Sequence, residues 1–302
     1  MIAFGASMTS PETYAEIAEP GIRRAAEPDS RVFAHQAAGS VSRTYNLILD
    51  QAGRLDDLEA LVLVHQDTEI ADPDFCAKLR RALADPEVAV VGCVGASRIR
   101  GIDWWDGDVS GGSATYCYGE SGGGEVPGVS WSAGSRGRFE TGEVETVDGF
   151  LIALSPWAVR NVRFDESLGM LHGFDVDYCL QVRAARRKVV TADLRVLHHH
   201  ALELVTANEP WMAAHMRVAE KWEGRLPAAD GSETDWKRRA RRAEGEAALA
   251  RLVVEARERE RDALAKVQEA DLRALTGTFS WRVTEPLRRL NAWRRARRTR
   301  TA

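Results

Sequence analysis

Short apolar runs alternate with helix-like stretches through the first two thirds of the chain, and this rhythm limits the fold more than any other feature. Residues 61–64 are apolar at every position, as in a strand that is buried on both faces of a parallel sheet. Ser10-Pro11 and Ser155-Pro156 each supply an N-cap followed by proline at the first helical position. Repeated strand–helix units of this kind predict an α/β sandwich with a mainly parallel sheet and helices on both faces.

The same patterns set the expected bounds of each element. The expected strands span residues 2–5, 31–35, 61–64, 88–91, 150–154 and 188–197. The expected helices span residues 10–26, 42–52, 72–84 and 174–187, and another begins at Ser155. Between residues 101 and 145 the regularity breaks and glycines are frequent, so we expect a long loop that is either functional or disordered.

After Pro227 the chain changes character, which predicts a second domain. Residues 233–275 are rich in Ala, Arg and Glu, contain no proline and carry apolar residues at a weak heptad spacing. They predict a long helix that either associates with a second copy as a coiled coil or lies alone in solvent with i,i+4 ion pairs. We therefore expect one domain at residues 1–226 and a helical extension at residues 227–302.

Charge is distributed unevenly along the chain. The formal net charge is -4, yet from Trp281 to the end there are eight arginines and one acid, so the remainder is strongly acidic. Arginines beside Trp281 and Trp293 are typical of a peripheral anchor on an anionic membrane. A patch that binds nucleic acid or another polyanion has a similar composition, so this basic tail has two interpretations.

The cysteines and the N-terminus predict a cytoplasmic protein. The four cysteines are far apart in sequence, which indicates reduced thiols rather than a disulfide framework. The first residues lack the basic region and the long apolar stretch of a signal peptide. No apolar run approaches the roughly 20 residues of a membrane-spanning helix, so we expect any membrane contact to be peripheral, at the inner face of the plasma membrane.

The segment His65-Gln66-Asp67-Thr68-Glu69 directly follows the apolar run at residues 61–64. In open α/β sheets, ligands bind beyond the carboxyl ends of the strands. Acids at this point can hold a hard divalent cation such as Mg2+ or Mn2+ beside phosphate groups. The alternative is an ordinary acidic turn.

Two further polar segments lie downstream. Asp175 and Asp177 lie at the start of the helix at residues 174–187; Asp175 can cap this helix or act as a carboxylate base, whereas we expect Asp177 to be structural. The triplet at residues 198–200 is all histidine. It could indicate a zinc hydrolase, but the helical HxxxH spacing is absent. One histidine that completes a mixed carboxylate–imidazole site is the better interpretation.

Taken in this order, the segments resemble glycosyltransferase family 2. The matching segments are residues 61–69, 147–150, 164–168, 172–177 and 196–199, and the resemblance covers about residues 1–225. It implies the GT-A nucleotide-sugar fold, a Rossmann-like α/β/α sandwich, here followed by a long C-terminal helix.

The resemblance also implies roles for individual residues. Asp67 would be the last acid of the family's DXD motif and would bind Mn2+ or Mg2+ together with His198, while Asp175 would be the general base. The donor-binding residues would be Ser7, Asn46, Gln66 and Asp67. The residues that contact the sugar or the acceptor would be Asp148, Gly149, His172 and Trp131. Plain core packing is the alternative for the tryptophan.

These roles imply an inverting, divalent-metal-dependent glycosyltransferase. It would move a sugar from a nucleotide-sugar donor to a glycan or a lipid-linked acceptor in cell-surface polysaccharide synthesis. Asp175 would accept the proton of the acceptor hydroxyl, and the cation would offset the charge of the leaving diphosphate. No second carboxylate nucleophile is evident, so we expect inversion.

The partners follow from the same resemblance. Because such acceptors are often lipid-linked, and residues 280–288 resemble the ends of bacterial surface-polysaccharide glycosyltransferases, we expect the tail to bind an anionic membrane and no nucleic acid. The helix at residues 233–275 would be the surface for self-association. The alternative function is a non-catalytic GT-A-like protein that binds nucleotide sugars or acts as a scaffold, because His65 and Phe174 occupy positions where the family carries acids.

Overall fold

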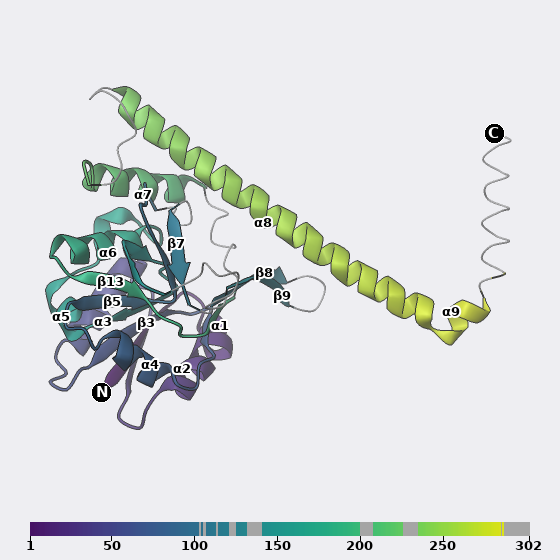
Figure 1. Cartoon of the computed structure of the whole chain (residues 1–302), viewed down its shortest axis with the longest axis horizontal. Coiled ribbons are helices and arrows are strands. Elements are labelled where there is room, and N and C mark those ends of the chain that lie inside the picture. Colours follow the sequence, from purple (N-terminus) through teal and green to yellow (C-terminus); the bar gives the residue numbers. More distant parts are fainter. Residues whose placement is uncertain are drawn as a thin grey trace. The chain divides into compact units, whose positions relative to one another are not determined.

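The computed structural model describes residues 1–102, 104, 107–112, 114–120, 125–131, 141–199, 208–225, 235–284 and 286. Of residues 116–120, 125–131, 208, 235–239, 280 and 282 it describes the backbone alone. The strands are β1 Ile2–Met8, β2 Arg31–Gln36, β3 Ala60–His65, β4 Thr68–Ile70, β5 Val88–Gly92, β6 Val94–Ser97, β7 Asp108–Gly111, β8 Ala114–Glu120, β9 Glu125–Trp131, β10 Glu143–Val144, β11 Thr146–Val147, β12 Leu151–Leu154, β13 Lys188–Thr191 and β14 Val196–His198. The helices are α1 Pro11–Thr13, α2 Glu19–Ala25, α3 Val41–Ala52, α4 Phe75–Ala82, α5 Pro156–Asn161, α6 Phe174–Ala184, α7 Asn208–Lys221, α8 Asp235–Gly277 and α9 Phe279–Val283 (Figure 1).

The central sheet has seven strands in the order β10-β13-β5-β12-β3-β1-β2. The pairs β1–β2, β1–β3 and β5–β13 are parallel, and β12 runs antiparallel between β3 and β5. Since β10 is also antiparallel to its neighbour, all the other strands of this sheet share one direction. The predicted mainly parallel α/β sheet is confirmed.

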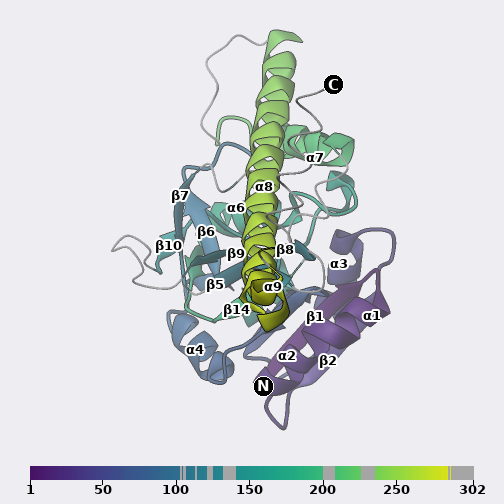
Figure 2. The same cartoon turned by 90° about the vertical axis from the view of Figure 1, so that its right-hand side faces the viewer.

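Helices cover both faces of the sheet. Alternate residues of each strand face opposite sides of the sheet, and apolar residues point to both sides. Along β3, Val62 and Val64 belong to one core cluster with residues of α2 and α4. Leu61 and Leu63 belong to the other, with residues of α3, α5 and α6. Figure 2 shows α2 beside β1 and β2. The apolar run read from the sequence is thus a strand buried on both sides.

Two predicted helix starts have the expected caps. The Ser10 hydroxyl accepts a hydrogen bond of 3.2 Å from the Thr13 amide, and the Ser155 hydroxyl accepts one of 3.3 Å from the Ala158 amide. The first helix does not continue as one α-helix to residue 26. A π-helical turn at Tyr14–Ala18 separates α1 from α2, with proline at position 20 just after it. Because proline lacks an N–H donor, the regular hydrogen-bond ladder cannot pass through that point.

The last predicted strand is wrong as a single element. Residues 188–197 form two strands, of which β13 belongs to the central sheet and β14 to a second sheet in the order β4-β14-β8-β9. Arg195 between them has a φ of 42°, which lies in the left-handed region and does not continue a strand. This change of sheet carries His198 from the central sheet to a place beside β4.

The expected loop at residues 101–145 is also wrong as a whole. It contains β7, β8, β9 and β10 among the residues that the structure describes. Glycines serve close packing here: a Cβ on Gly107 would lie 2.5 Å from the Ser97 carbonyl oxygen, and one on Gly112 would collide with the backbone of Asp193. Gly107 and Gly112 therefore lie where the chain passes close to other backbone.

The C-terminal part begins with α8, a helix of 43 residues. Contacts divide the chain into two compact units, Met1–Glu255 and Ala256–Ala302. Within the first unit, Ala248 and Leu249 of α8 are buried in the core cluster that includes α7 residues. Beyond it, α8 has exposed large apolar side chains at Leu264, Val267, Leu272 and Leu275. No helix in the described part of the chain is long and apolar enough to cross a membrane.

Candidate functional site

Three polar residues meet where β3 ends and β14 lies beside β4. His65 is the last residue of β3, and Asp67 precedes β4. Strand β14 pairs antiparallel with β4, so that His198 lies opposite Thr68. The His199 amide donates a hydrogen bond of 2.8 Å to the Asp67 carbonyl oxygen, which holds the two segments together.

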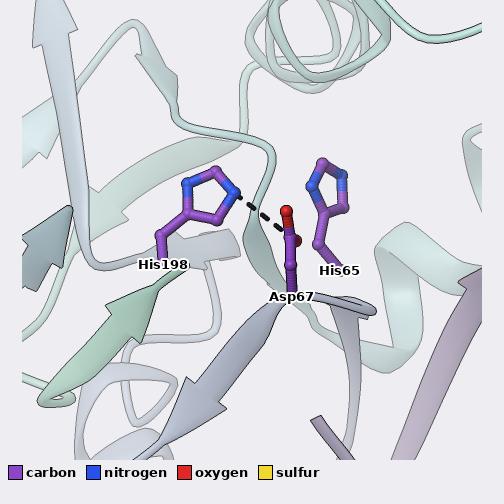
Figure 3. Close-up of side chains that lie close together, drawn as sticks. All are labelled: His65, Asp67 and His198. Atoms are coloured by element: carbon purple, nitrogen blue, oxygen red, sulfur yellow. Dashed lines mark ion pairs between the residues drawn. The ribbon is translucent and has the colours of Figure 1, made fainter. Parts of the chain in front are cut away.

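The side chains of His65, Asp67 and His198 converge. One nitrogen or oxygen atom from each lies within 4.8 Å of the others, and the Nε2 atom of His198 is 3.5 Å from Oδ1 of Asp67. Figure 3 shows the carboxylate of Asp67 pointing between the two imidazole rings. We call these three residues the triad. Its arrangement is that of a site able to hold one divalent cation.

Burial and charge act in opposite directions within the triad. Burial raises the pKa of Asp67. The charge and the hydrogen bond of His198, together with the charge of His65, outweigh burial and hold the pKa of Asp67 below its usual value. Burial lowers the pKa of His198, yet the Asp67 carboxylate outweighs burial and raises it. Burial dominates at His65 and lowers its pKa. The result is an ionised carboxylate beside two imidazoles, one of which prefers to be neutral.

Asp175 lies in the first turn of α6. Its carboxyl accepts hydrogen bonds of 2.9 Å from the amides of Gly149 and Val176. Burial raises its pKa to about 7, and the nearby charge of Asp148 adds to the shift. A carboxyl that titrates near neutral pH can exchange a proton with a hydroxyl group.

Glycine at position 149 permits the contact with Asp175. A Cβ there would lie 2.6 Å from the Phe174 ring and 2.9 Å from Oδ2 of Asp175. The neighbouring Asp148 acts electrostatically on His65, His198 and Asp175. Asp148 is therefore close enough to affect both the triad and Asp175, and we treat these residues as one candidate site.

A hollow of about 640 Å³ opens beside the triad. It is lined by residues of β1 and α1, of the segment from β2 to the start of α3, of the end of β3 and the turn after it, and of the segment before α6: Ser7, Thr9, Thr13, Ala37, Gly39, Ser40, Val41, His65, Gln66, Asp67, Met170 and Leu171. Its volume suits a ligand of the size of a nucleotide. The structure thus brings three of the four predicted donor residues to one cavity.

Gln66 shapes one wall of this cavity. Its Oε1 atom accepts hydrogen bonds of 2.8 and 2.9 Å from the amides of Thr9 and Ser10, and its Nε2 atom donates one of 2.9 Å to the Thr9 hydroxyl. With its side chain engaged in this way, Gln66 fixes the loop that follows β1. We therefore assign it a positioning role at the wall of the cavity.

Asn46 is the predicted donor residue that the structure does not bring to the cavity. Its amide donates a hydrogen bond of 3.0 Å to the Phe164 carbonyl oxygen and accepts one of 3.0 Å from the Phe164 amide. It also donates to Glu166. Both polar atoms of the Asn46 side chain are engaged in these bonds, which connect α3 to the segment before the turn at Glu166–Leu168.

The remaining predicted residues differ in position. His172 is partly buried just before α6, and burial lowers its pKa. Trp131 ends β9, and its side chain lies outside the described residues. Asp177 is fully buried and accepts a hydrogen bond of 2.8 Å from the Trp222 indole, as expected of a structural residue.

Sequence reasoning did not assign His65 to the metal ligands. It treated this position only as a replacement for an acid. The signal in the sequence is the spacing, because His65 and Asp67 lie two positions apart at a strand end. Both belong to the motif noted there, but the imidazole nitrogens of His65 were not considered as metal ligands.

The comparisons with known proteins concern the family of this chain. Residues 18–224 match the family model described as "Glycosyltransferase like family". The chain is 29% identical over 210 residues to the streptomycin biosynthesis protein StrF of Streptomyces griseus, and the match covers 66% of each chain. The chain thus spans slightly less than two thirds of the length of this curated relative.

Two solved structures are similar at low sequence identity. One is the mannosyltransferase PcManGT from Pyrobaculum calidifontis in complex with GDP-Man and Mn2+: 14% identity, 93% of this chain and 82% of that chain covered, TM-score 0.45. The other is A197 from STIV: 14% identity, 65% and 82% covered, TM-score 0.39. Both TM-scores are low, and neither structure adds to what the family match shows.

Proposed function

The chain belongs to the glycosyltransferase-like family, and on that premise we propose that it is an inverting, divalent-metal-dependent glycosyltransferase. It would move a sugar from a nucleotide-sugar donor to a glycan or lipid-linked acceptor in cell-surface polysaccharide synthesis. One observation carries the proposal: a triad of side chains that could hold a divalent cation lies near a carboxyl with a pKa of about 7, and the charge of Asp148 acts on both.

The donor would bind in the hollow beside the triad. Asp67 and His198 would hold Mn2+ or Mg2+, and Ser7 and Gln66 lie in the wall that would face the nucleotide. When bound, the cation would offset the negative charge that grows on the diphosphate as the bond to the sugar breaks. Asn46 would act at a distance, by holding the segment at Phe164.

Asp175 would accept the proton of the acceptor hydroxyl. Its two backbone hydrogen bonds fix the carboxyl, and burial keeps its pKa close to neutrality, so the group can both accept and release a proton. The acceptor or the transferred sugar would contact Asp148, Gly149, His172 and Trp131. A single displacement at the sugar carbon inverts its configuration.

The C-terminal part would bring the enzyme to its acceptor. We propose a catalytic domain at residues 1–226 and a helical extension at residues 227–302 that binds an anionic membrane or a second copy, and no nucleic acid. Phe279, Trp281 and Val283 of α9 are exposed apolar residues, which supports an interfacial role. Cytoplasmic localisation at the inner face of the plasma membrane would follow from this arrangement.

The test is nucleotide release from a panel of uridine, guanosine and thymidine diphosphate sugars, with Mn2+, with Mg2+ and with chelator. The acceptor panel should combine lipid-linked glycans with small glycosides, since the Streptomyces griseus relative is named for streptomycin biosynthesis. We expect release with at least one donor that depends on the cation and on Asp67, so that Asp67→Asn is inactive. Calorimetry that detects nucleotide binding without any release would instead favour the non-catalytic alternative.

A further inference from the structure

We propose that His65 is a metal ligand and that it makes this site select a first-row transition-metal cation over Mg2+. The inference deepens the proposed function and rests on it, because the cation is the one that would meet the donor diphosphate.

The first observation is the Nε2 atom of His65. It is buried and has no hydrogen-bond partner among the described residues. Buried polar atoms in folded proteins are nearly always partnered. The ring lies 6.0 Å from the His198 ring and 5.8 Å from the Phe174 ring, measured between centroids. None of the described residues thus engages this nitrogen, and the His65 ring stands beside the Asp67 carboxylate (Figure 3).

The second observation is the placement of the three side chains. Their ligand atoms lie within 4.8 Å of one another (Figure 3). Two ligands of one cation, each at about 2.1 Å, are at most about 4.2 Å apart, so a small rotation of the rings brings the outermost pair into range. The backbone is already fixed: β14 pairs with β4, and the His65 amide donates a hydrogen bond of 2.9 Å to the Phe150 carbonyl oxygen.

The third step is the chemistry of the donor set. Mg2+ prefers oxygen ligands and keeps several waters, whereas imidazole nitrogen suits transition metals, with affinity rising from Mn2+ through Co2+. Two imidazoles and one carboxylate form the mixed set typical of transition-metal centres. An acid at position 65 would give the oxygen-rich set that serves Mg2+. The single histidine therefore determines which cation the site prefers.

The experiment is calorimetric titration of the full chain, stripped of metal, with MnCl2, CoCl2 or MgCl2 and no nucleotide. For the wild type we expect Co2+ to bind more tightly than Mn2+, and both at least about tenfold more tightly than Mg2+. His65→Asp should shift the ratio of Co2+ to Mg2+ affinity toward Mg2+ by at least about tenfold. His35→Asp makes the same chemical change on β2, where His35 bonds to Gln51, and should leave the ratio unchanged.

Two results would overturn the inference: a wild type that binds Mg2+ as tightly as Co2+, or a His65→Asp chain that keeps the wild-type ratio. Circular dichroism melts check that the variants fold. If His65→Asp does not fold, His65→Gln replaces it, and unchanged Co2+ affinity in that variant counts against the inference. Because the metal is titrated alone, these results do not depend on whether any sugar is transferred, so this inference and the proposed function can fail separately.

Discussion

At the scale of single residues, Asp175 shows how the fold prepares a group for proton transfer. Burial and the charge of Asp148 raise its pKa, while the amides of Gly149 and Val176 act in the opposite direction. The balance leaves the pKa at about 7. The Tyr45 and Cys179 side chains lie near Asp175. Burial raises the pKa of each, and the charge of Asp175 raises it further.

This balance predicts a pH dependence. Only the ionised carboxyl can accept a proton, so kcat/KM for nucleotide release should rise as the pH passes through about 7 and level off above it. The folded-state pKa lies above the ordinary value of 3.8, so the stability that the protonated group contributes is lost as the pH rises through about 7. A rate profile that is flat between about pH 6 and pH 8 would contradict the role assigned to Asp175.

The sequence predicts some site residues well and others poorly, for physical reasons. Asp67 follows β3, and ligands bind beyond the carboxyl ends of the strands in open α/β sheets, so its place in the site could be anticipated. His198 ends β14 of the second sheet, and its place beside Asp67 depends on the pairing of β14 with β4. Asn46 lies within a helix, where sequence alone does not show which neighbour its amide contacts. The metal-binding capacity of His65 depends on a distance to His198, which lies 133 positions away in the chain and becomes apparent only once β14 is seen beside β4.

At the scale of elements, Asp177 connects α6 with the end of α7. Its fully buried carboxyl accepts a hydrogen bond of 2.8 Å from the Trp222 indole and one of 2.8 Å from Gln181, and it forms an ion pair of 2.8 Å with Lys221. Lys221 also pairs with Asp165 at 2.6 Å. These bonds fix α7 against the helix that carries Asp175.

The Trp222→Phe variant should therefore lose stability. It removes a hydrogen bond to a buried charge, which costs about 1.5–3 kcal/mol in the free energy of unfolding, measured by urea denaturation. Trp157→Phe is the matched control, since the Trp157 ring is partly exposed and contacts the Arg187 guanidinium. An equal decrease in the free energy of unfolding in the two variants would show that the hydrogen bond to Asp177 does not contribute to stability.

Element prediction failed where contacts distant in sequence decide the structure. The pattern at residues 188–197 predicts one strand because valine and leucine recur along it, but the segment divides between two sheets at Arg195. The glycines after residue 101 were read as loop signals, although Gly107 and Gly112 permit close backbone contacts. The bounds of β1, β2, β3 and β5 were predicted to within a few residues.

At the scale of the whole molecule, the chain consists of two compact units with different surfaces. The first, Met1–Glu255, contains the site, and the second, Ala256–Ala302, carries exposed apolar residues on α8 and α9. Exposed large apolar side chains beside arginines are typical of contact with a membrane surface or a partner. We predict that the arginine-rich tail, which contains Trp281 and Trp293, anchors the chain to a membrane.

Binding to vesicles tests that anchor. The full chain should co-sediment with vesicles containing phosphatidylserine, should bind pure phosphatidylcholine vesicles weakly, and should be released as salt is raised, because screening weakens the arginine contacts. A double variant, Phe279→Ser with Trp281→Ser, should bind several-fold more weakly. Leu272→Ser on α8, also an exposed apolar position, is the control. Undiminished binding after deletion of residues 277–302 would exclude the tail as the anchor.

The central claim is that this chain is a glycosyltransferase in which the triad holds a cation and Asp175 accepts the acceptor's proton. Nucleotide release by the Asp175→Asn variant tests this claim most directly. The assay uses the best donor of the panel with saturating cation, and Asp50→Asn, at an exposed surface ion pair with Arg163, is the control. We expect release that is slower by roughly 100- to 10,000-fold in Asp175→Asn, with nucleotide binding retained and Asp50→Asn fully active. Wild-type rates in Asp175→Asn would contradict it.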